Sequence, residues 1–356
     1  MSRPIRCRFP PPIATLWKNR LKVMPMGISD PLLDLAHGER DLNRIDAALR
    51  QSVETGDEFL TQVASHLIVA GGKRLRPLFS AAAGSIAEPG DGAPQDAIMG
   101  GVAVELVQVG SLYHDDVMDE ADMRRSVDSV NARWGNLTAI LAGDFLLAKA
   151  SEIAASLGVE VAGLLASTIG QLCEGQVIEL QDVFNPDRPM ERYLRSIDGK
   201  TAALFATACR IGGIVSDRTR PEIDALTAYG HSFGMAFQVV DDVLDTVATE
   251  EQLGKPAGHD LIEGVYTLPV LHALEGPHGS ELRDLLGGPL EEAAFDKAIG
   301  IVRSSTGVAQ ALAAAQGYAT AAIEAIEIFP KNTVTNALSE TAHEVVDQAR
   351  QISAAA

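Results

Sequence analysis

From about Leu32 to Ser353, apolar residues recur at intervals of three and four positions, and this spacing constrains the fold more than any other feature. It lines up apolar side chains along one face of an α-helix, whereas a half-buried strand would need strict alternation. Clusters of Gly, Pro and Asp divide the pattern into roughly ten or more helices. These breaks lie at 70–72, 88–94, 185–189, 216–221, 254–258 and 276–279. Because each is too short to link separate domains, the sequence predicts one all-α domain.

The composition fits this fold and excludes several functions. Hydrophobic residues make up 46% of the 356 residues but aromatic ones only 5%, which favours helices over a β-sandwich. A net charge of -19 repels nucleic acids and anionic membranes, so neither is expected as a partner. Three widely spaced cysteines without a CxxC pair argue against a disulfide framework or a zinc site. No stretch reaches about 18 consecutive apolar residues, so we expect no transmembrane segment and a cytoplasmic protein.

Residues 1–28 differ from the rest of the chain. The segment is basic, contains no acidic residue, includes Pro10, Pro11 and Pro12 in a row, and lacks the apolar stretch of a signal peptide. We interpret it as a disordered extension, or as sequence upstream of a start at Met24 or Met26, rather than as a targeting signal. The folded domain is accordingly expected over residues 29–356.

Two acidic clusters with the spacing Asp-Asp-x-x-Asp follow apolar runs, one in LYHDDVMDEADMRR (112–125) and one in FQVVDDVLD (237–245). On a helix, residues three and four positions apart share a face, so each cluster groups three carboxylates that repel one another. The repulsion needs an offsetting cation, and grouped carboxylate oxygens suit Mg²⁺, which also bridges to phosphates. A single such cluster is more often a solvated acidic face, but two in one chain are far more specific. The candidate ligands are Asp115, Asp116, Asp119, Asp241, Asp242 and Asp245.

Basic residues stand near the predicted helix ends, where they can meet an anion. GGKRLRP (71–77) places three cations after a glycine turn at a helix start, whose free N–H groups favour a phosphate. Arg124 and Arg125 follow the first acidic cluster, Lys200 and Thr201 begin the apolar run KTAALF, and Lys255 follows the second cluster. Each alone is most often a surface cation. In a chain with only 29 Lys and Arg residues, their repeated placement at apolar helix ends predicts a diphosphate site.

Together these motifs resemble the trans-isoprenyl diphosphate synthase family, in the expected order from about Leu67 to Gln316. The matching segments are GGKRLRP, the first acidic motif with its paired arginines, WGNLTAILAGD (134–144), GKTAALF, FQVVDDVLD, and GKPAGHDLIEGVYTLP, which ends at Pro269. The resemblance implies the isoprenoid synthase type I fold, which is a single-domain antiparallel helical bundle around a deep central cavity. The same resemblance implies a catalytic domain over residues 29–356 and a homodimer. It also implies a prenyltransferase that condenses isopentenyl diphosphate head-to-tail with an allylic diphosphate to make an all-trans polyprenyl diphosphate.

The resemblance further implies a role for each matching residue. The allylic diphosphate would be held by about three Mg²⁺ ions, for which Mn²⁺ can substitute, bound by Asp115, Asp116, Asp119, Asp241 and Asp242, with Asp245 behind them. Its charge would be neutralised by Arg124, Lys200 and Lys255. Isopentenyl diphosphate, which binds without metal, would lie against Gly72, Lys73, Arg76, Gln108 and Arg125. Thr201 and Gln238 would lie beside the reacting carbons.

The chemistry explains these residue types. Ionising an allylic carbon–oxygen bond needs a stabilised leaving group, which metal ions and cations supply without a protein nucleophile. Water would quench the resulting carbocation, so the remaining wall should be apolar. One departure from the family is Val265, where a lysine is usual, so one cation is missing from the allylic side. A weaker departure is Gln108, where long-chain members often carry His and short-chain members Gln.

Product length depends, in this family, on the helix that leads into the first acidic cluster. One helical turn rises about 5.4 Å, comparable to one extended isoprene unit, so each turn back from Asp115 corresponds to roughly one more unit. Short-chain enzymes place aromatic rings four or five positions before the cluster, where this chain has Ser111 and Gly110. Val107 and Val104 follow on the same face, so we expect a product of about thirty carbons or more. Alternatively, Gly110 only lets a neighbouring helix pack closely, and Tyr113 could narrow the entrance.

Four other functions remain open at this stage. A short-chain farnesyl or geranylgeranyl diphosphate synthase would share every motif. A class I terpene synthase would share the metal-binding logic, but GGKRLRP and the second complete acidic motif argue against it. A regulatory subunit of a heteromeric synthase would be expected to lose aspartates, and this chain keeps all six. A metal-dependent phosphohydrolase could use His114 and Asp115, but the other spaced histidines of such a site are missing.

Overall fold

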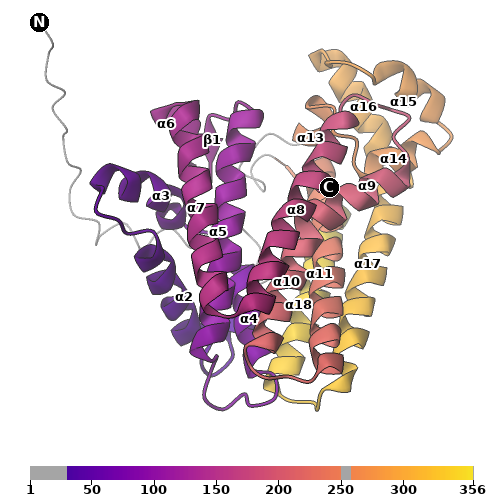
Figure 1. Ribbon diagram of the computed structural model, residues 1–356. Helices are drawn as coiled ribbons and strands as arrows, with labels where there is room; N and C mark the ends of the chain where they lie inside the picture. Colours follow the sequence, from indigo (N-terminus) through magenta and orange to yellow (C-terminus); the bar gives the residue numbers. More distant parts are fainter. Residues whose placement is uncertain (1–29, 250–257, 356) are drawn as a thin grey trace, which may run out of the picture.

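The computed structural model describes residues 30–249 and 258–355, and these residues form a bundle of long helices (Figure 1). The first half contains α1 (Asp30–Leu33), α2 (Gly38–Ser52), α3 (Glu58–Ala70), α4 (Leu75–Ser85), α5 (Gln95–Met118), α6 (Val130–Trp134), α7 (Asn136–Ser156) and α8 (Val159–Gln181). The second half contains α9 (Met190–Ile197), the π-helix η3 (Asp198–Ala202), α10 (Ala203–Ile214), α11 (Arg220–Val247), α13 (His259–Ile262), α14 (Leu268–Leu274), α15 (Gly279–Leu285), α16 (Glu292–Ser304), α17 (Gly307–Ala325), the 3₁₀-helix η4 (Ile326–Ile328) and α18 (Thr333–Ala355). The predicted all-α fold is confirmed, and the breaks predicted within the described ranges fall at helix boundaries.

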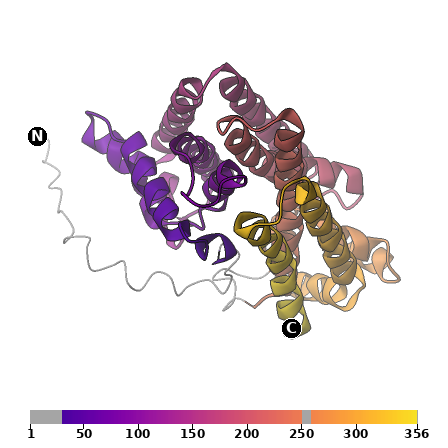
Figure 2. The same ribbon diagram turned by 90° about the horizontal axis from the view of Figure 1, so that it is seen from below.

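The arrangement of the helices brings distant parts of the sequence together. Figure 2 shows the N-terminal helices on one side of the bundle and α17 and α18 on the other. Helix α10 packs against α4 and α5 on one side and against α11 on the other, so it joins the two halves. The segments that follow α5 and α11, namely β1 and α13, lie at the same end of the molecule (Figure 1). Both acidic clusters therefore lie at one end of the bundle.

Aromatic side chains fill the core where α4, α10 and α11 meet. The Phe79 and Phe233 rings lie edge to face with centroids 4.6 Å apart, and the Phe205 ring lies 5.3 Å from that of Phe233. Edge-to-face contacts of this kind add to the gain from burying apolar area. The Cζ atom of Arg76 lies 4.3 Å from the Phe205 ring centroid, so the core also supports a residue of the predicted diphosphate site.

Two glycines allow helices to approach closely beside η3. A Cβ atom at Gly234 of α11 would lie 2.6 Å from Ala202 Cα, and one at Gly175 of α8 would lie 2.6 Å from the Lys200 backbone nitrogen. Real side chains do not tolerate such distances, so only glycine fits at either position. These contacts hold η3, and with it Lys200 and Thr201, between α8 and α11.

A short β-hairpin after α5 was not predicted from the sequence. Strands β1 (Met123–Arg124) and β2 (Val127–Asp128) pair antiparallel, and Arg125 and Ser126 connect them with φ angles of 52° and 60°. Two positive φ angles define the tight turn that suits a two-residue hairpin loop. A two-residue strand is too short to show alternation, so the pattern that revealed the helices could not reveal it.

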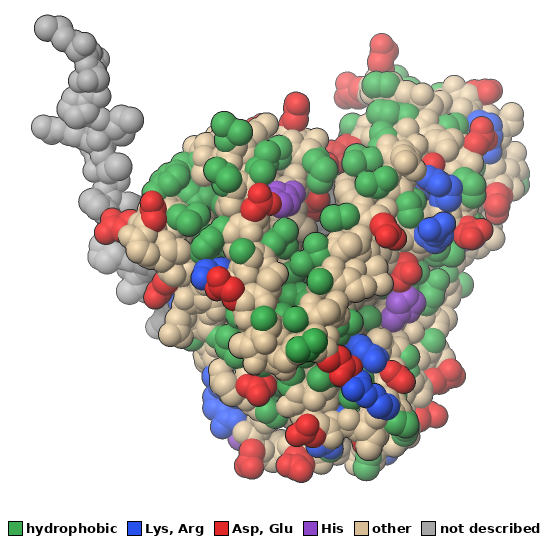
Figure 3. Space-filling view, in the orientation of Figure 1, with side chains coloured by type: hydrophobic (Ala, Val, Ile, Leu, Met, Phe, Trp, Pro, Cys, Tyr) green, Lys and Arg blue, Asp and Glu red, His purple; other side chains and the backbone are tan. Residues whose placement is uncertain are grey.

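Helix α8 carries an apolar surface that the rest of the described chain leaves uncovered. Among the described residues it is the one helix long and apolar enough to cross a membrane by length and composition alone, yet only 22% of its most apolar window is buried. Val159, Val177 and Leu180 of α8 are exposed, as are Leu137 and Leu141 of the adjacent α7. Figure 3 shows hydrophobic side chains along this side of the molecule.

Candidate active site

The first acidic cluster lies at the C-terminal end of α5. Asp115 and Asp116 belong to the last helical turn, and Asp119 caps the helix with its N–H donating to Asp115 O at 2.8 Å. A helix C-terminus is the negative end of the helix dipole, so three carboxylates there are doubly unfavourable. Burial raises the pKa of Asp115 and of Asp116. This end of α5 therefore requires positive charge from elsewhere.

Arg124 on β1 supplies part of that charge to Asp116. Its Nε and Nη2 atoms lie 2.7 and 2.6 Å from Asp116 Oδ1. Asp116 is fully buried, and within the described ranges its Oδ2 atom accepts no hydrogen bond. A buried carboxylate oxygen without a donor is costly, so this atom suits a cation that the protein itself does not supply.

The second acidic cluster lies near the end of α11. Asp242 is buried, and burial raises its pKa to about 7, although hydrogen bonds from Tyr193 and Gln238 oppose the shift. Asp245 is also buried, and its Oδ2 accepts a hydrogen bond from Asp260 N at 3.1 Å at the start of α13. Asp241 is exposed, and its charge acts on Lys73.

Two adjacent residues of η3 connect the clusters. The Lys200 ammonium lies 2.6 Å from Glu179 Oε1 of α8. Burial alone would lower the pKa of Lys200, but Glu179 and Asp115 together raise it. The next residue, Thr201, donates from Oγ1 to Gln238 Oε1 at 2.7 Å, and Gln238 Nε2 donates to Asp242 Oδ1 at 2.9 Å. Within this π-helical turn, Lys200 thus acts on Asp115, and Thr201 is connected to Asp242 through Gln238.

The GGKRLRP segment provides a third, basic side. Burial lowers the pKa of Lys73, and Asp241 partly offsets the shift. Burial lowers the pKa of Arg76 to about 10, and its Nε makes no hydrogen bond within the described residues. Gly72 has a φ of 155°, and a Cβ there would lie 3.1 Å from Arg125 Cζ. The loop at Gly72 therefore packs closely against Arg125. Arg76 can bind an anion, because its Nε–H group has no partner within the described residues.

Sequence analysis missed the buried acid that organises this basic side. Glu105 of α5 is 3% exposed; its Oε1 lies 3.1 Å from Arg74 Nη1 and 3.7 Å from Arg125 Nη2. Arg74 also donates to Asp46 Oδ1 at 3.0 Å, and Arg125 Nη1 donates to Leu67 O at 2.8 Å. An acid inside the otherwise apolar run of α5 was the available signal. Glu179 and Tyr193 were also missed, because neither lies within a recognisable motif.

Further residues singled out from the sequence lie on α5 and beside α13, and the structure shows where each is placed. Gln108 is partly buried, and its backbone oxygen accepts a hydrogen bond from Ser111 Oγ at 3.0 Å. A Cβ at Gly110 would lie 3.1 Å from Gly143 O of α7, so this position faces a neighbouring helix. Val107 is 1% exposed, and Val265 N donates to Asp260 O at 2.8 Å. The predictions for Lys255 and for the segment 1–28 lie outside the described residues.

The carboxylates of the two acidic clusters fit a metal ion that also binds the oxygens of a phosphate ligand. Within residues 30–249 and 258–355, no three His, Cys, Asp or Glu side chains are grouped closely enough to hold an ion by themselves. Mg²⁺ commonly takes one or two carboxylates and completes its shell with water and phosphate oxygens. Asp116, with its unpartnered oxygen, and the exposed Asp241 can supply such carboxylates.

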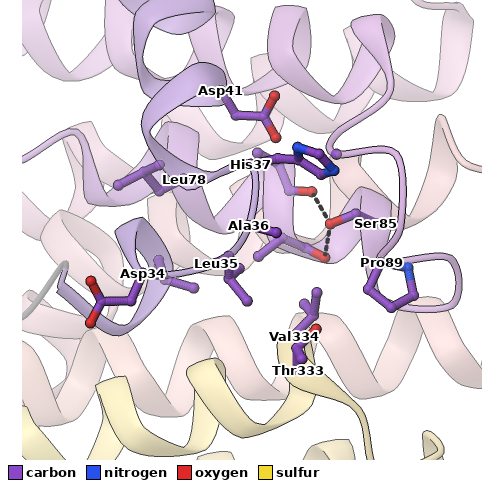
Figure 4. A pocket seen from close by; sticks show the side chains of 15 residues that line it. Asp34, Leu35, Ala36, His37, Asp41, Leu78, Ser85, Pro89, Thr333 and Val334 are labelled. Carbon is purple, nitrogen blue, oxygen red and sulfur yellow. Dashed lines mark hydrogen bonds between the residues drawn. The ribbon is translucent and has the colours of Figure 1, made fainter.

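Two cavities of the described chain lie away from the acidic clusters. One, of about 140 Å³, lies between the α1–α2 connection, α4 and the start of α18 (Figure 4). Its polar groups have partners, since Asp41 accepts from Ala93 N at 2.8 Å and Ser85 donates to Ala81 O at 3.1 Å. The other, of about 250 Å³, lies between the α8–α9 connection and α14. Neither is lined by a predicted site residue.

Comparison with known proteins agrees with the geometry. Residues 57–302 match the family model described as polyprenyl synthetase. A nonaprenyl diphosphate synthase from Mycobacterium tuberculosis is 39% identical over 290 residues, which are 81% of this chain and 86% of that protein. Heptaprenyl diphosphate synthase component 2 from Geobacillus stearothermophilus is 36% identical over 303 residues, or 85% and 94% of the two chains. A polyprenyl synthase from Caulobacter crescentus, solved with calcium and isoprenyl diphosphate, superposes with a TM-score of 0.82 at 34% identity and covers 89% of this chain and 97% of that one.

Replacing Glu105 tests its role on the basic side. Glu105→Gln leaves the buried guanidinium group of Arg74 and the partly buried one of Arg125 without their shared counter-charge, so we expect a loss of about 3–5 kcal/mol in the free energy of unfolding. Asp46→Asn, which removes the more exposed partner of Arg74, should cost about 1 kcal/mol or less. Urea unfolding followed by circular dichroism measures both. Equal, small losses would contradict a central role for Glu105.

Proposed function

The chain belongs to the polyprenyl synthetase family, and on that premise we propose that it is a trans-polyprenyl diphosphate synthase. It lengthens an allylic diphosphate with isopentenyl units and makes a medium- to long-chain product. The observation that carries the proposal is the pair Lys200 and Thr201, because it ties both acidic clusters to one centre. A regulatory role is disfavoured because both clusters keep all their aspartates.

The reaction breaks one bond and forms another. The carbon–oxygen bond of the allylic diphosphate breaks, and its electron pair stays on the departing diphosphate. The isopentenyl double bond then attacks the allylic carbon to form the new carbon–carbon bond, which leaves a cation on the tertiary carbon of the isopentenyl unit. The carbon between that centre and the diphosphate-bearing carbon then loses a proton to the departed diphosphate, and its electron pair forms the new double bond. Mg²⁺, when bound, neutralises the diphosphate charge and so improves the leaving group.

On the allylic side, the protein orients negative and positive groups around the diphosphate. Asp115, Asp116, Asp119, Asp241 and Asp242 would hold about three Mg²⁺ ions, the pattern that the family implies. Arg124 and Lys200 already lie beside the first cluster, so their charges can stabilise the leaving group without rearrangement. Asp245 holds the start of α13 through Asp260 N, which supports a structural role behind the metal ligands.

On the other side, cations receive isopentenyl diphosphate without metal. Lys73, Arg76 and Arg125 would bind its phosphates, with Gly72 allowing close approach and Gln108 adding a polar contact. Burial lowers the pKa of all three cations, as expected for groups that are packed tightly before an anion arrives. Thr201 and Gln238, which share a hydrogen bond of 2.7 Å, would lie beside the reacting carbons.

A product assay with one substitution tests the proposal. Purified protein with Mg²⁺, labelled isopentenyl diphosphate and each allylic primer in turn should incorporate label into a polyprenyl chain. Asp116→Asn should lower kcat about 100-fold or more, the scale seen when one charge-stabilising group is lost. Asp122→Asn, an exposed aspartate six positions later in the chain, is the matched control and should retain activity.

The assay also separates the alternatives. A class I terpene synthase would release diphosphate without incorporating isopentenyl label, and a short-chain synthase would stop at fifteen or twenty carbons. Absence of incorporation with every primer would contradict the proposed activity. Equal activity of the two variants would contradict the metal-binding role of Asp116.

Product length offers a second test. We propose that the growing tail runs along the face of α5 that carries Val107 and Ser111, which present no aromatic ring. Ser111→Phe would place a ring about one helical turn before the cluster, so it should shorten the product by several isoprene units on chromatography. Gly110→Ala is the matched control, because its added methyl group would meet Gly143 O of α7, and it should leave the product length unchanged. An unchanged product in Ser111→Phe would contradict this path for the tail.

We also propose that the enzyme is a cytoplasmic homodimer that pairs through α7 and α8. The exposed side chains of this surface include Leu137 at 80%, Leu141 at 67% and Val159 at 91%. Large exposed apolar side chains gathered on two neighbouring helices mark an interface, and a second copy would cover them with the same helices. Pairing thus accounts for the apolar character of α8 without a membrane.

Light scattering after size exclusion tests the dimer. The wild-type protein should have twice the chain mass of 37.7 kDa, and Leu141→Glu should shift it toward the monomer because a charge would be buried. Ile328→Glu is the control, since Ile328 is 55% exposed but lies on η4 rather than on this surface. A wild-type monomer that is inactive alone would contradict the homodimer and favour assembly with a different subunit.

A further inference from the structure

The carboxylate of Asp242 is held by two neutral donors. Gln238 Nε2 donates to Oδ1 at 2.9 Å from the preceding turn of α11, and the Tyr193 hydroxyl donates to Oδ2 at 2.5 Å from α9. Asp242 is 3% exposed, so water does not compete for these positions. With one donor on each oxygen, the carboxylate plane is fixed, and one acceptor position on each oxygen remains.

The Tyr193 side chain is buried, and its hydroxyl group binds Asp242. It is 1% exposed, and its hydroxyl bonds to Asp242 rather than to backbone, unlike the buried Tyr229, whose hydroxyl donates to Leu338 O at 2.8 Å. Burial and the neighbouring Asp242 charge raise the pKa of Tyr193, so the phenol keeps its proton and remains a donor.

Arg188 holds the Tyr193 ring from the other side. Its Cζ lies 5.5 Å from the ring centroid, and the residue is 4% exposed. Its Nη2 donates to Ser196 Oγ at 2.6 Å and its Nη1 to Tyr266 O at 3.4 Å, so it joins α9 to the segment that follows Val265. Arg188 also brings a buried positive charge to the region from which the usual lysine is missing.

We propose that Tyr193 is a positioning residue for Asp242, fixing the direction in which this carboxylate can bind a divalent cation, and that Arg188 fixes Tyr193. This proposal rests on the proposed function, because it concerns one of the two acidic clusters. Partners that orient a metal-binding carboxylate commonly change metal affinity by about 10- to 100-fold when removed. Neither residue belongs to a motif that the sequence analysis singled out.

Tyr193→Phe tests the proposal because it keeps the ring in the core and removes only the hydroxyl. The measured quantity is the Mg²⁺ concentration that half-saturates binding of a labelled allylic thiodiphosphate, whose bridging sulfur resists ionisation. We expect this concentration to rise about tenfold or more, with KM for isopentenyl diphosphate changed less than twofold. Tyr229→Phe, which removes an equally buried hydroxyl, should leave both quantities unchanged.

A metal-free measurement separates positioning from general packing. With chelator present, the urea midpoint is compared for Tyr193→Phe, Asp242→Ala and the double variant. If the hydroxyl acts through Asp242, the shift caused by Tyr193→Phe largely disappears in the Asp242→Ala background. Additive shifts would overturn the proposal.

Arg188→Met should raise the half-saturating Mg²⁺ concentration in the same direction as Tyr193→Phe. Arg192→Met is the matched control, since Arg188 and Arg192 both pair with Asp182, at 3.6 and 2.7 Å, but the Arg192 side chain is 37% exposed. If Arg188→Met fails to fold, Arg188→Lys replaces it. Wild-type protein that binds the analogue without Mg²⁺ dependence would overturn the proposed function, whereas a Mg²⁺-dependent wild type with an unaffected Tyr193→Phe would overturn only the positioning role.

Discussion

Repulsion among grouped carboxylates is the constraint on which the rest of the site depends. Asp115, Asp116 and Asp119 crowd the negative end of a helix dipole, and burial further raises the free energy of the charged forms of Asp115 and Asp116. A fold keeps such a cluster only if positive charge arrives from other elements. Here it comes from β1 through Arg124 and from η3 through Lys200, so the cluster sets the positions of segments far away in the sequence.

The helical architecture meets this demand by placing α10 between α5 and α11. Close packing at Gly234 and Gly175 holds η3 on two sides, and a π-helical turn there directs adjacent residues toward different clusters. In an ordinary α-helix, neighbouring side chains lie about 100° apart and the backbone hydrogen bonds are regular. π-Helical turns are rare and are found frequently at functional sites. The basic side is organised differently: one buried acid, Glu105, pairs with two guanidinium groups from separate segments.

The sequence predicted those features that depend on local spacing. The helices followed from apolar periodicity, and the aspartates followed from a motif that one helical face must display. Glu105, Glu179 and Tyr193 could not be predicted in this way, because each matters only through a partner distant in sequence: Arg74 lies 31 residues from Glu105 and Asp242 lies 49 residues from Tyr193. From the sequence, Lys73 and Arg76 were assigned to the diphosphate site but Arg74 was given no role, since only the structure reveals its pairing with the buried Glu105. The hairpin that carries Arg124 escaped notice because two-residue strands have no period.

Helix α8 shows how one element can serve the site and the assembly together. Its inward side carries Gly175 and Glu179, which contact the backbone and the ammonium group of Lys200. Its outward side carries the exposed Val177 and Leu180, which lie within one helical turn of Glu179 along the chain. A rigid helix transmits displacement along and across its axis, since packed interiors resist compression. A second copy seated on the outward side would therefore contact the same helix that positions Lys200.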